Sequence, residues 1–398
     1  MPIISKIPVL GAAFLAASLA SLVSAQEAPV VGSENANPET KSAKAHTAMI
    51  SAKSFKVFYT KKYDLSGLPH YAPETQVTGT LHVMGNNYIG DSTVANGWRD
   101  GFGKFQPGIK IEYFLPSAAI SFPALMFGGA DLVMDHKALF YDLLGYQRMF
   151  GADPFEITAL TGSYNVTGWL STYGIVVNKA NPFAGISMKQ LDGVFGAQRP
   201  GGWDGTSWRP DWARGPEKNI RTWGQLGMTG DWADKPIHTY GFSVRYSAAI
   251  GFANIVLAGS DKWADSYMGY GNYRDRNGKV VLEGQQIVDA VEKDPDAIAF
   301  TLWQDSYAPK CRMIAVSAGD GTDYVQPSWD TLFDSSYPLH NHFYWYLNHK
   351  PGAKWDPKVR EFLHYALSQE GQEVLMRDGK YLPLNADLAR AQWRKLDE

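Results

Sequence analysis

Four short polar segments of the chain each follow a predicted buried strand and precede a predicted helix. This position places backbone N–H groups and polar side chains at the start of a helix, where the helix dipole favours a negative charge. Hydroxyls, amides, a carboxylate and a guanidinium are the groups that hold a small oxyanion by hydrogen bonds. The candidate ligand-binding residues are Asn86, Asn87, Asp91, Ser92, Thr93, Ser117, Asp135, Arg245, Tyr246 and Ser247.

Each of these segments also has a structural alternative. The first segment, which follows Gly85, could simply supply an N-cap for the next helix, and Ser117 could do the same for the second. Pro123 disfavours a helix capped by Ser117, because an interior proline breaks a helix. Ser121 is therefore the more comfortable cap, and Asp135 could equally be a surface acid or a helix cap.

The elements that must position these residues alternate between strands and helices. Strand patterns cover 80–84, 109–113 and 132–134, and the helices between them begin near 92 and include 124–127. This order predicts a parallel sheet with right-handed crossovers. Such a sheet binds ligands at the carboxyl ends of its strands, where the four polar segments lie.

A second set of alternating elements follows. Strand patterns at 173–178, 236–240 and 297–300 accompany helices that begin at Ser187, begin near Tyr246 and cover 287–291. A Trp- and Gly-rich stretch over 195–232 is too irregular for one regular element. Near the end of the chain, an aromatic strand precedes a helix with Asp356 as its N-cap and Pro357 at its first position.

Composition excludes several classes of protein. The chain has 398 residues, 45% of them hydrophobic, which is enough for two domains with real cores. Its net charge of -3 gives no basic character for nucleic acid. Cys311 is the single cysteine, so no internal disulfide or Cys-based zinc site forms, and the pair His340 and His342 lacks a further metal ligand. Without a nucleophile elbow, a zinc-protease motif or a Walker loop, we expect no enzyme, no cofactor and no metal.

The first 25 residues have the order of a secretory signal peptide. Lys6 precedes an apolar run over 7–22, and Val23, Ser24 and Ala25 fit the small-residue cleavage pattern. A membrane anchor is the alternative, but the run is short and rich in small residues. We therefore expect a periplasmic protein with residues 1–25 as signal peptide and 26–75 as a flexible leader and add-on segment.

The C-terminal segment over 337–384 reads YPLHNHFYWYL and, after a linker, DPKVREFLHYALSQEGQEVLMRDGKYLPL. These residues resemble the end of the phosphate-type solute-binding proteins of ABC importers. The resemblance implies a two-lobed α/β periplasmic-binding-protein fold of type II, each lobe a mostly parallel sheet flanked by helices. Residues 76–170 and 335–398 would form lobe I and 171–334 lobe II.

The resemblance also assigns roles to the candidate residues. Either Ser92 and Thr93 or the two asparagines at 86 and 87 would supply the first set of donors, and Ser117 matches a family hydroxyl. Asp135 matches the acid that accepts a hydrogen bond from the protonated oxygen of phosphate. Sulfate carries no such proton at neutral pH, so this acceptor would select phosphate.

The second-lobe anion motif departs from the family. Phe242 stands at the position of the family arginine, Val244 replaces its aspartate, and residues 246–248 replace a Ser-Gly-Thr turn. Arg245 is nearby and could reach the ligand or point to solvent.

The expected function is capture of phosphate or a related small anion between two lobes, by a monomer that delivers it to an ABC permease in the inner membrane. A different small solute or a ligand-less envelope scaffold is the alternative, and a secreted hydrolase is a more remote one.

Overall fold

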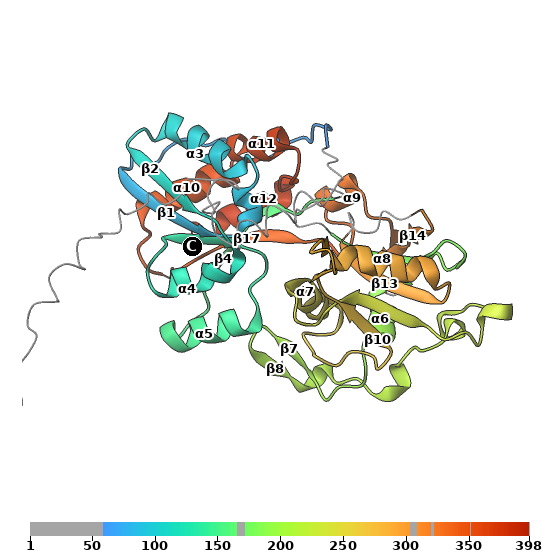
Figure 1. The fold of residues 1–398 in the computed structure, drawn as a ribbon. Coiled ribbons are helices and arrows are strands. Elements are labelled where there is room, and N and C mark those ends of the chain that lie inside the picture. Colours follow the sequence, from blue (N-terminus) through green and yellow to red (C-terminus); the bar gives the residue numbers. More distant parts are fainter. Residues whose placement is uncertain (1–58, 165–171, 303–308, 320–321, 351, 398) are drawn as a thin grey trace, which may run out of the picture.

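The computed structural model describes residues 59–164, 172–302, 309–319, 322–350 and 352–397. The chain forms two lobes, each built on a five-stranded sheet with helices packed on it (Figure 1). The predicted signal peptide and the predicted leader up to residue 58 lie outside the described residues.

The sheet of the first lobe has the strand order β2-β1-β3-β17-β4. Its strands are β1 (Gly79–Gly85), β2 (Ile109–Phe114), β3 (Leu132–Asp135), β4 (Phe155–Thr161) and β17 (His342–Leu347). Strand β1 pairs in parallel with β2 and β3, whereas β17 is antiparallel to β3 and β4. Four strands therefore run one way and β17 runs against them, which confirms the predicted mostly parallel sheet.

The sheet of the second lobe repeats this plan in the order β10-β9-β13-β5-β14. Its strands are β5 (Tyr173–Asn178), β9 (His238–Phe242), β10 (Tyr267–Tyr270), β13 (Ala297–Leu302) and β14 (Cys311–Met313). Strand β9 is parallel to β10 and β13, and β5 is antiparallel to β13 and β14. In each sheet the reversed strand is the first one formed after the chain arrives from the other lobe.

Short helices and hairpins complete the two lobes. The helices are α2 (Asn87–Gly90), α3 (Val94–Phe105), α4 (Ser121–Met126), α5 (Phe140–Phe150), α6 (Met188–Phe195), α7 (Ser247–Val256), α8 (Glu283–Lys293), α9 (Trp329–Phe333), α10 (Pro357–Leu367), α11 (Gln369–Asp378) and α12 (Ala386–Arg394). The shorter strands are β6 (Gly185–Ser187), β7 (Gly202–Asp204), β8 (Ser207–Arg209), β11 (Tyr273–Arg274), β12 (Val280–Val281), β15 (Ala315–Ser317) and β16 (Tyr324–Val325). Within the described ranges, no helix has the length and apolar character that a membrane span requires.

The predicted helix start at Ser187 and the predicted cap at Asp356 are confirmed. The Ser187 side chain accepts from the backbone N–H of Gln190 at the start of α6, and Asp356 accepts from Lys358 with Pro357 at the first helical position of α10.

The two connections between the lobes lie side by side. The Thr172 hydroxyl donates to the Leu339 carbonyl at 2.7 Å, and the Tyr337 hydroxyl donates to the Tyr173 carbonyl at 2.8 Å. Tyr337 and Leu339 still pack in the core of the second lobe, so the returning chain leaves that core just before β17.

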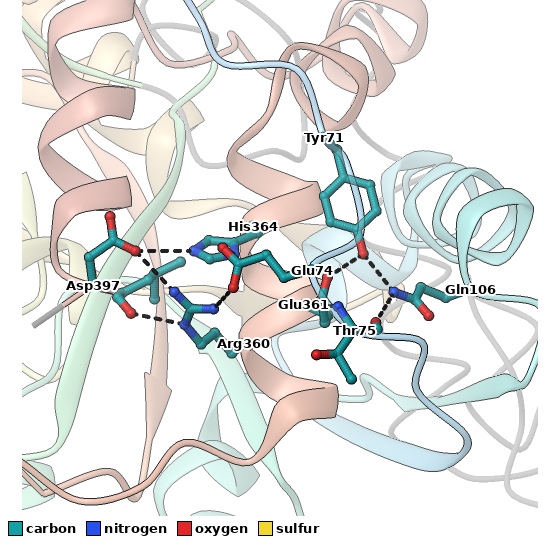
Figure 2. Close-up of polar contacts among 9 residues, drawn as sticks. Tyr71, Glu74, Thr75, Gln106, Arg360, Glu361, His364 and Asp397 are labelled. Carbon is teal, nitrogen blue, oxygen red and sulfur yellow. Dashed lines mark hydrogen bonds and ion pairs between the residues drawn. The ribbon is translucent and has the colours of Figure 1, made fainter.

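Residues 59–75 form no regular element but pack against the first lobe. Leu65, Leu68 and Tyr71 belong to its hydrophobic core. Figure 2 shows how Tyr71 and Thr75 meet Glu361 of α10, a carboxylate that is 3% exposed. Its oxygens accept from the Tyr71 hydroxyl at 2.6 Å and from the Thr75 backbone N–H at 2.7 Å. These bonds fasten the segment to α10.

The Trp-rich stretch reaches from the second lobe to the first. Its β7–β8 hairpin lies beneath α5 in Figure 1. The Trp203 ring meets the Phe140 ring of α5 edge to face, with centroids 5.0 Å apart. The Thr206 hydroxyl donates to the Gln147 side chain at 2.8 Å. We call this set of contacts the hairpin contact.

Candidate ligand-binding cleft

A cavity of about 470 Å³ lies between the two lobes. Its walls are segments at strand ends of both sheets and at helix starts of the second lobe, together with the chain that returns to the first lobe. The lining residues are Asn86, Asn87, Tyr88, Ser117, Ala118, His136, Lys137, Leu139, Tyr173, Phe242, Tyr246, Ser247, Ala248, Gly251, Asn254, Ile255, Glu283, Leu302, His340, Asn341, His342 and Tyr344.

Sheet topology explains why these residues meet. In the first lobe, Asn86, Ser117 and His136 follow the carboxyl ends of β1, β2 and β3. In the second lobe, β9 and β13 end at the cavity and the reversed strand β5 starts there, as does the reversed strand β17 of the first lobe. The cleft therefore occupies the place where an open α/β sheet binds its ligands.

The first loop turns into the cleft at Gly85. Its φ of 138° is one that residues with a side chain rarely adopt, and a Cβ there would lie 2.2 Å from the Met134 carbonyl oxygen. Asn86 then caps α2, its side-chain oxygen accepting from the Tyr88 backbone N–H at 2.8 Å. Asn86 and Asn87 line the cavity, so the asparagines rather than the later hydroxyls face the ligand space.

The later residues of that loop face elsewhere. Asp91, Ser92 and Thr93 do not line the cavity. The backbone N–H and the hydroxyl of Thr93 both donate to Asp378 of α11, at 2.8 and 2.7 Å. The Ser92 hydroxyl donates to the Ile89 carbonyl at 2.7 Å. Thr93 therefore ties the loop to α11, and Ser92 stabilises the turn within the loop; the N-cap residue of α3 is Thr93, without a side-chain capping bond.

Ser117 lines the cavity and also acts as a cap. Its hydroxyl accepts from the Ala119 backbone N–H at 3.2 Å and starts the 3-10 turn η2 (Ala118–Ile120). Helix α4 begins only at Ser121, which leaves Pro123 in its first turn, where proline is tolerated. The two serines therefore begin two successive elements.

Asp135 lies behind the cavity wall. It is 4% exposed, and its Oδ1 accepts from the His136 backbone N–H at 2.8 Å. Burial raises the pKa of Asp135, and the neighbouring His136 and hydrogen bonds, including one from Asn86, oppose that rise. The carboxyl does not line the cavity, but both of its neighbours, Asn86 and His136, do.

We expect Asp135→Asn to stabilise the protein at neutral pH. A carboxyl whose pKa is higher in the folded chain than in the unfolded chain binds protons more readily when folded, so its ionisation opposes folding as the pH rises. The asparagine variant should have a higher Tm than the wild type at pH 7, and the difference should shrink as the pH falls towards the pKa of an unfolded aspartate, about 3.9. A constant difference across this range would contradict the raised pKa.

The second-lobe segment places Phe242 in the cavity wall, at the position where the sequence resemblance expects an arginine. Phe242 is 1% exposed, lines the cavity and lies against the Phe300 ring at a centroid distance of 5.9 Å. Tyr246 and Ser247 line the cavity at the start of α7. Arg245 is exposed and is not part of the cavity wall, as in the solvent-facing alternative. No arginine of the described ranges lines the cleft.

The lysine and histidine side chains that line the cleft come from the segment after β3 and from around the start of β17. Lys137 lines the cavity, but its ammonium pairs with Glu156 at 2.6 and 2.7 Å and lies 5.0 Å from the centre of the Tyr344 ring. His340 and His342 face each other with ring centroids 4.6 Å apart. Burial, with smaller contributions from His340 and Lys137, lowers the pKa of His342 to about 3. His342 is therefore neutral at physiological pH.

The residues at 340–344 were not among the predicted ligand-binding residues. The alternate spacing of His340, His342 and Tyr344 was the available signal, since residues two apart on a strand share a face. Across the described ranges, no group of three or more His, Cys, Asp or Glu side chains could hold a metal ion.

Comparison with known proteins gives one informative result. No protein-family model matches the chain. The chain is 26% identical over 330 residues to the phosphate-binding protein PstS of two strains of Pseudomonas aeruginosa, covering 83% of this chain and 90% of that protein.

Similar solved structures include an ABC-type phosphate transport receptor from Vibrio cholerae, at 15% identity and a TM-score of 0.46 over 76% of this chain and 99% of that one. PstS from Borrelia burgdorferi follows at 12% identity and a TM-score of 0.48 over 77% of this chain and 99% of that one.

The sequence similarity to PstS extends over most of both chains and agrees with the resemblance at the C-terminus. Over most of its length the chain is therefore similar to the phosphate-binding protein PstS.

Proposed function

We propose that this protein is an exported, periplasmic, monomeric solute-binding protein that captures phosphate or a related small anion between its lobes and delivers it to an ABC permease. Residues 76–170 and 335–398 would form lobe I and 171–334 lobe II, with the return crossing at 335–341. The observation that carries the proposal is the cavity of about 470 Å³ at strand ends from both sheets, in a chain similar to PstS.

The anion would be held mainly by neutral donors. Asn86 and Asn87 offer amides from the first lobe, and Ser247 offers a hydroxyl and a backbone N–H at the start of α7, where the helix dipole attracts a negative charge. His342 offers a neutral imidazole. Asp135 lies directly behind Asn86 and His136. Its carboxylate would accept a hydrogen bond from a protonated oxygen of the ligand only if the cleft wall rearranged to expose the carboxylate.

The absence of an arginine from the cleft lowers the affinity that we expect for phosphate. A bidentate, charge-assisted pair with an anion is among the strong hydrogen-bonding arrangements in proteins, and losing it should weaken binding by roughly 2–4 kcal/mol, on the order of 30- to 1,000-fold. The second candidate is a different anionic solute with an apolar part. The aromatic lining favours it, because Tyr88, Tyr173, Phe242 and Tyr344 surround more space than a phosphate ion fills.

Calorimetry on the full chain with phosphate, sulfate and phenylphosphonate would test the proposal. We expect phosphate to bind, and Asn86→Ala and Ser247→Ala each to raise its Kd about tenfold, the effect of losing about 1.4 kcal/mol. Arg245→Ala is the matched control, because Arg245 is exposed beside the same helix start but outside the cavity, and it should leave the Kd unchanged.

The outcomes separate the candidates. Tighter binding of phenylphosphonate than of phosphate, weakened by the same two substitutions, would favour the larger solute. Phosphate binding that collapses in Arg245→Ala would place the ligand elsewhere than in this cavity. Absence of binding to all three anions would refute the proposal.

A further inference from the structure

The second lobe contains a second cavity, of about 710 Å³, that shares no lining residue with the cleft. It lies against the start of α6, the segment 213–225 and the β15–β16 turn. Its size falls within the range of about 300–1,000 Å³ that small-molecule sites occupy. Most of the residues that line it are polar.

The side chain of Arg214 in this cavity wall is buried without an acceptor. The residue is 6% exposed, and its Nε, Nη1 and Nη2 atoms have no hydrogen-bond partner within the described residues. A guanidinium stays protonated in proteins, and buried charged groups are as a rule paired and hydrogen-bonded. Arg214 is held in place by two backbone hydrogen bonds of 2.9 Å with Arg199.

The nearest carboxylate is already occupied. Asp192 accepts a bidentate pair from Arg199, with Nη1–Oδ1 at 2.6 Å and Nη2–Oδ2 at 2.8 Å. The Arg214 Nε lies 3.5 Å from the same Oδ2, which is contact at the limit of an ion pair and no hydrogen bond. The carboxylate of Asp192 is therefore shared by two buried arginines, Arg199 and Arg214.

A neighbouring arginine shows how this region satisfies a purely structural guanidinium. Arg221 donates to the carbonyl oxygens of Gly193, Ile220 and Gly196 at 2.8, 2.9 and 2.9 Å. Arg214 has no such carbonyls. Among the residues that line the cavity, four cations, Lys189, Arg199, Arg214 and Lys218, face two acids, Asp192 and Glu217.

We propose that this cavity binds a small organic ligand through a carboxylate or phosphate group that pairs with Arg214. Both groups match the planar fork of a guanidinium and would satisfy its nitrogens in two parallel hydrogen bonds. The rest of the ligand would lie along the polar wall, where the buried Asn219 Oδ1 also lacks a partner. Access runs past Glu217 and Lys218, which are exposed at the rim.

Calorimetry on the full chain with citrate and with glycerol 3-phosphate tests the proposal and separates the two anionic groups. We expect at least one of them to bind, and Arg214→Gln to raise its Kd at least about tenfold, as for loss of a bidentate pair. Arg214→Lys, which keeps the charge but not the fork, should weaken binding nearly as much. Glycerol carries neither group and should not bind.

Two further variants keep the result interpretable. The Asn86→Ala/Ser247→Ala double variant has an impaired cleft. If it binds citrate or glycerol 3-phosphate with an unchanged Kd, the site lies in the second-lobe cavity, whatever the cleft binds. Lys218→Gln alters only an exposed rim charge and should raise the Kd about two- to threefold even if Arg214→Gln fails to fold. Absence of binding by both anions, or Kd values that Arg214→Lys and Lys218→Gln leave unchanged, would overturn the proposal.

Discussion

Replacing Glu361 by alanine should lower the free energy of unfolding by about 3–5 kcal/mol, the largest single effect we expect outside the hydrophobic cores. The carboxylate is buried and accepts two short hydrogen bonds, from the Tyr71 hydroxyl and the Thr75 backbone N–H. Hydrogen bonds to a charged group contribute roughly 1.5–3 kcal/mol each, and the alanine variant leaves the buried Tyr71 hydroxyl without this acceptor.

Urea unfolding of the full chain would measure this loss. Tyr71→Phe removes one of the two bonds and should cost about 1–2 kcal/mol. Glu373→Ala is the matched control: Glu373 lies on α11 with its side chain 41% exposed and meets Arg377 at 3.6 Å in an i,i+4 pair. Such a pair contributes at most about 0.5 kcal/mol. Equal losses for Glu361→Ala and Glu373→Ala would mean that residues 59–75 are not fastened through this carboxylate.

Acid should destabilise the protein through His342, and His342→Gln should remove that part of the acid sensitivity. Burial lowers the pKa of His342 to about 3, whereas the ordinary value is 6.5. Between these values the unfolded chain binds a proton that the folded chain does not, so stability falls as the pH falls below 6.5. The expected loss by pH 5 is about 1–2 kcal/mol, because the residue as a whole keeps some exposure.

The measurement compares the wild type with His342→Gln by urea unfolding at pH 7.5 and pH 5. The stability of the variant should fall by about 1–2 kcal/mol less than that of the wild type over this interval. His364, whose pKa burial also lowers, is present in both proteins and cancels in the difference. Parallel declines would show that His342 titrates near its ordinary pKa.

Much of the fold could be predicted from the sequence because the signals that decide it are local. The apolar runs that become β3, β5 and β13 are buried almost throughout, and short capping motifs fix where α6 and α10 begin. The same patterns predicted which strand ends would meet at the cleft. They also indicated that Phe242 stands where the resembling family has an arginine. The structure places Phe242 in the cleft wall.

The rest depended on contacts between distant parts of the chain. His342 and Tyr344 reach the cleft only because β17 runs against its neighbours and brings its amino end to their carboxyl ends. Glu361 meets a segment 290 residues away in sequence. Thr93 was a reasonable ligand donor by position, but the acceptor that it actually meets, Asp378, lies in a helix near the other end of the chain.

The hairpin contact bears on how easily the two lobes separate. An edge-to-face aromatic pair and one hydrogen bond together stabilise an arrangement by about 1–3 kcal/mol, which is about 5- to 150-fold in population. Trp203 with Phe140 and Thr206 with Gln147 join the lobes without involving any residue of the cleft wall. This part of the free energy that holds the lobes together is therefore independent of any ligand in the cleft, and a variant that loses it should separate its lobes more easily whatever the cleft binds.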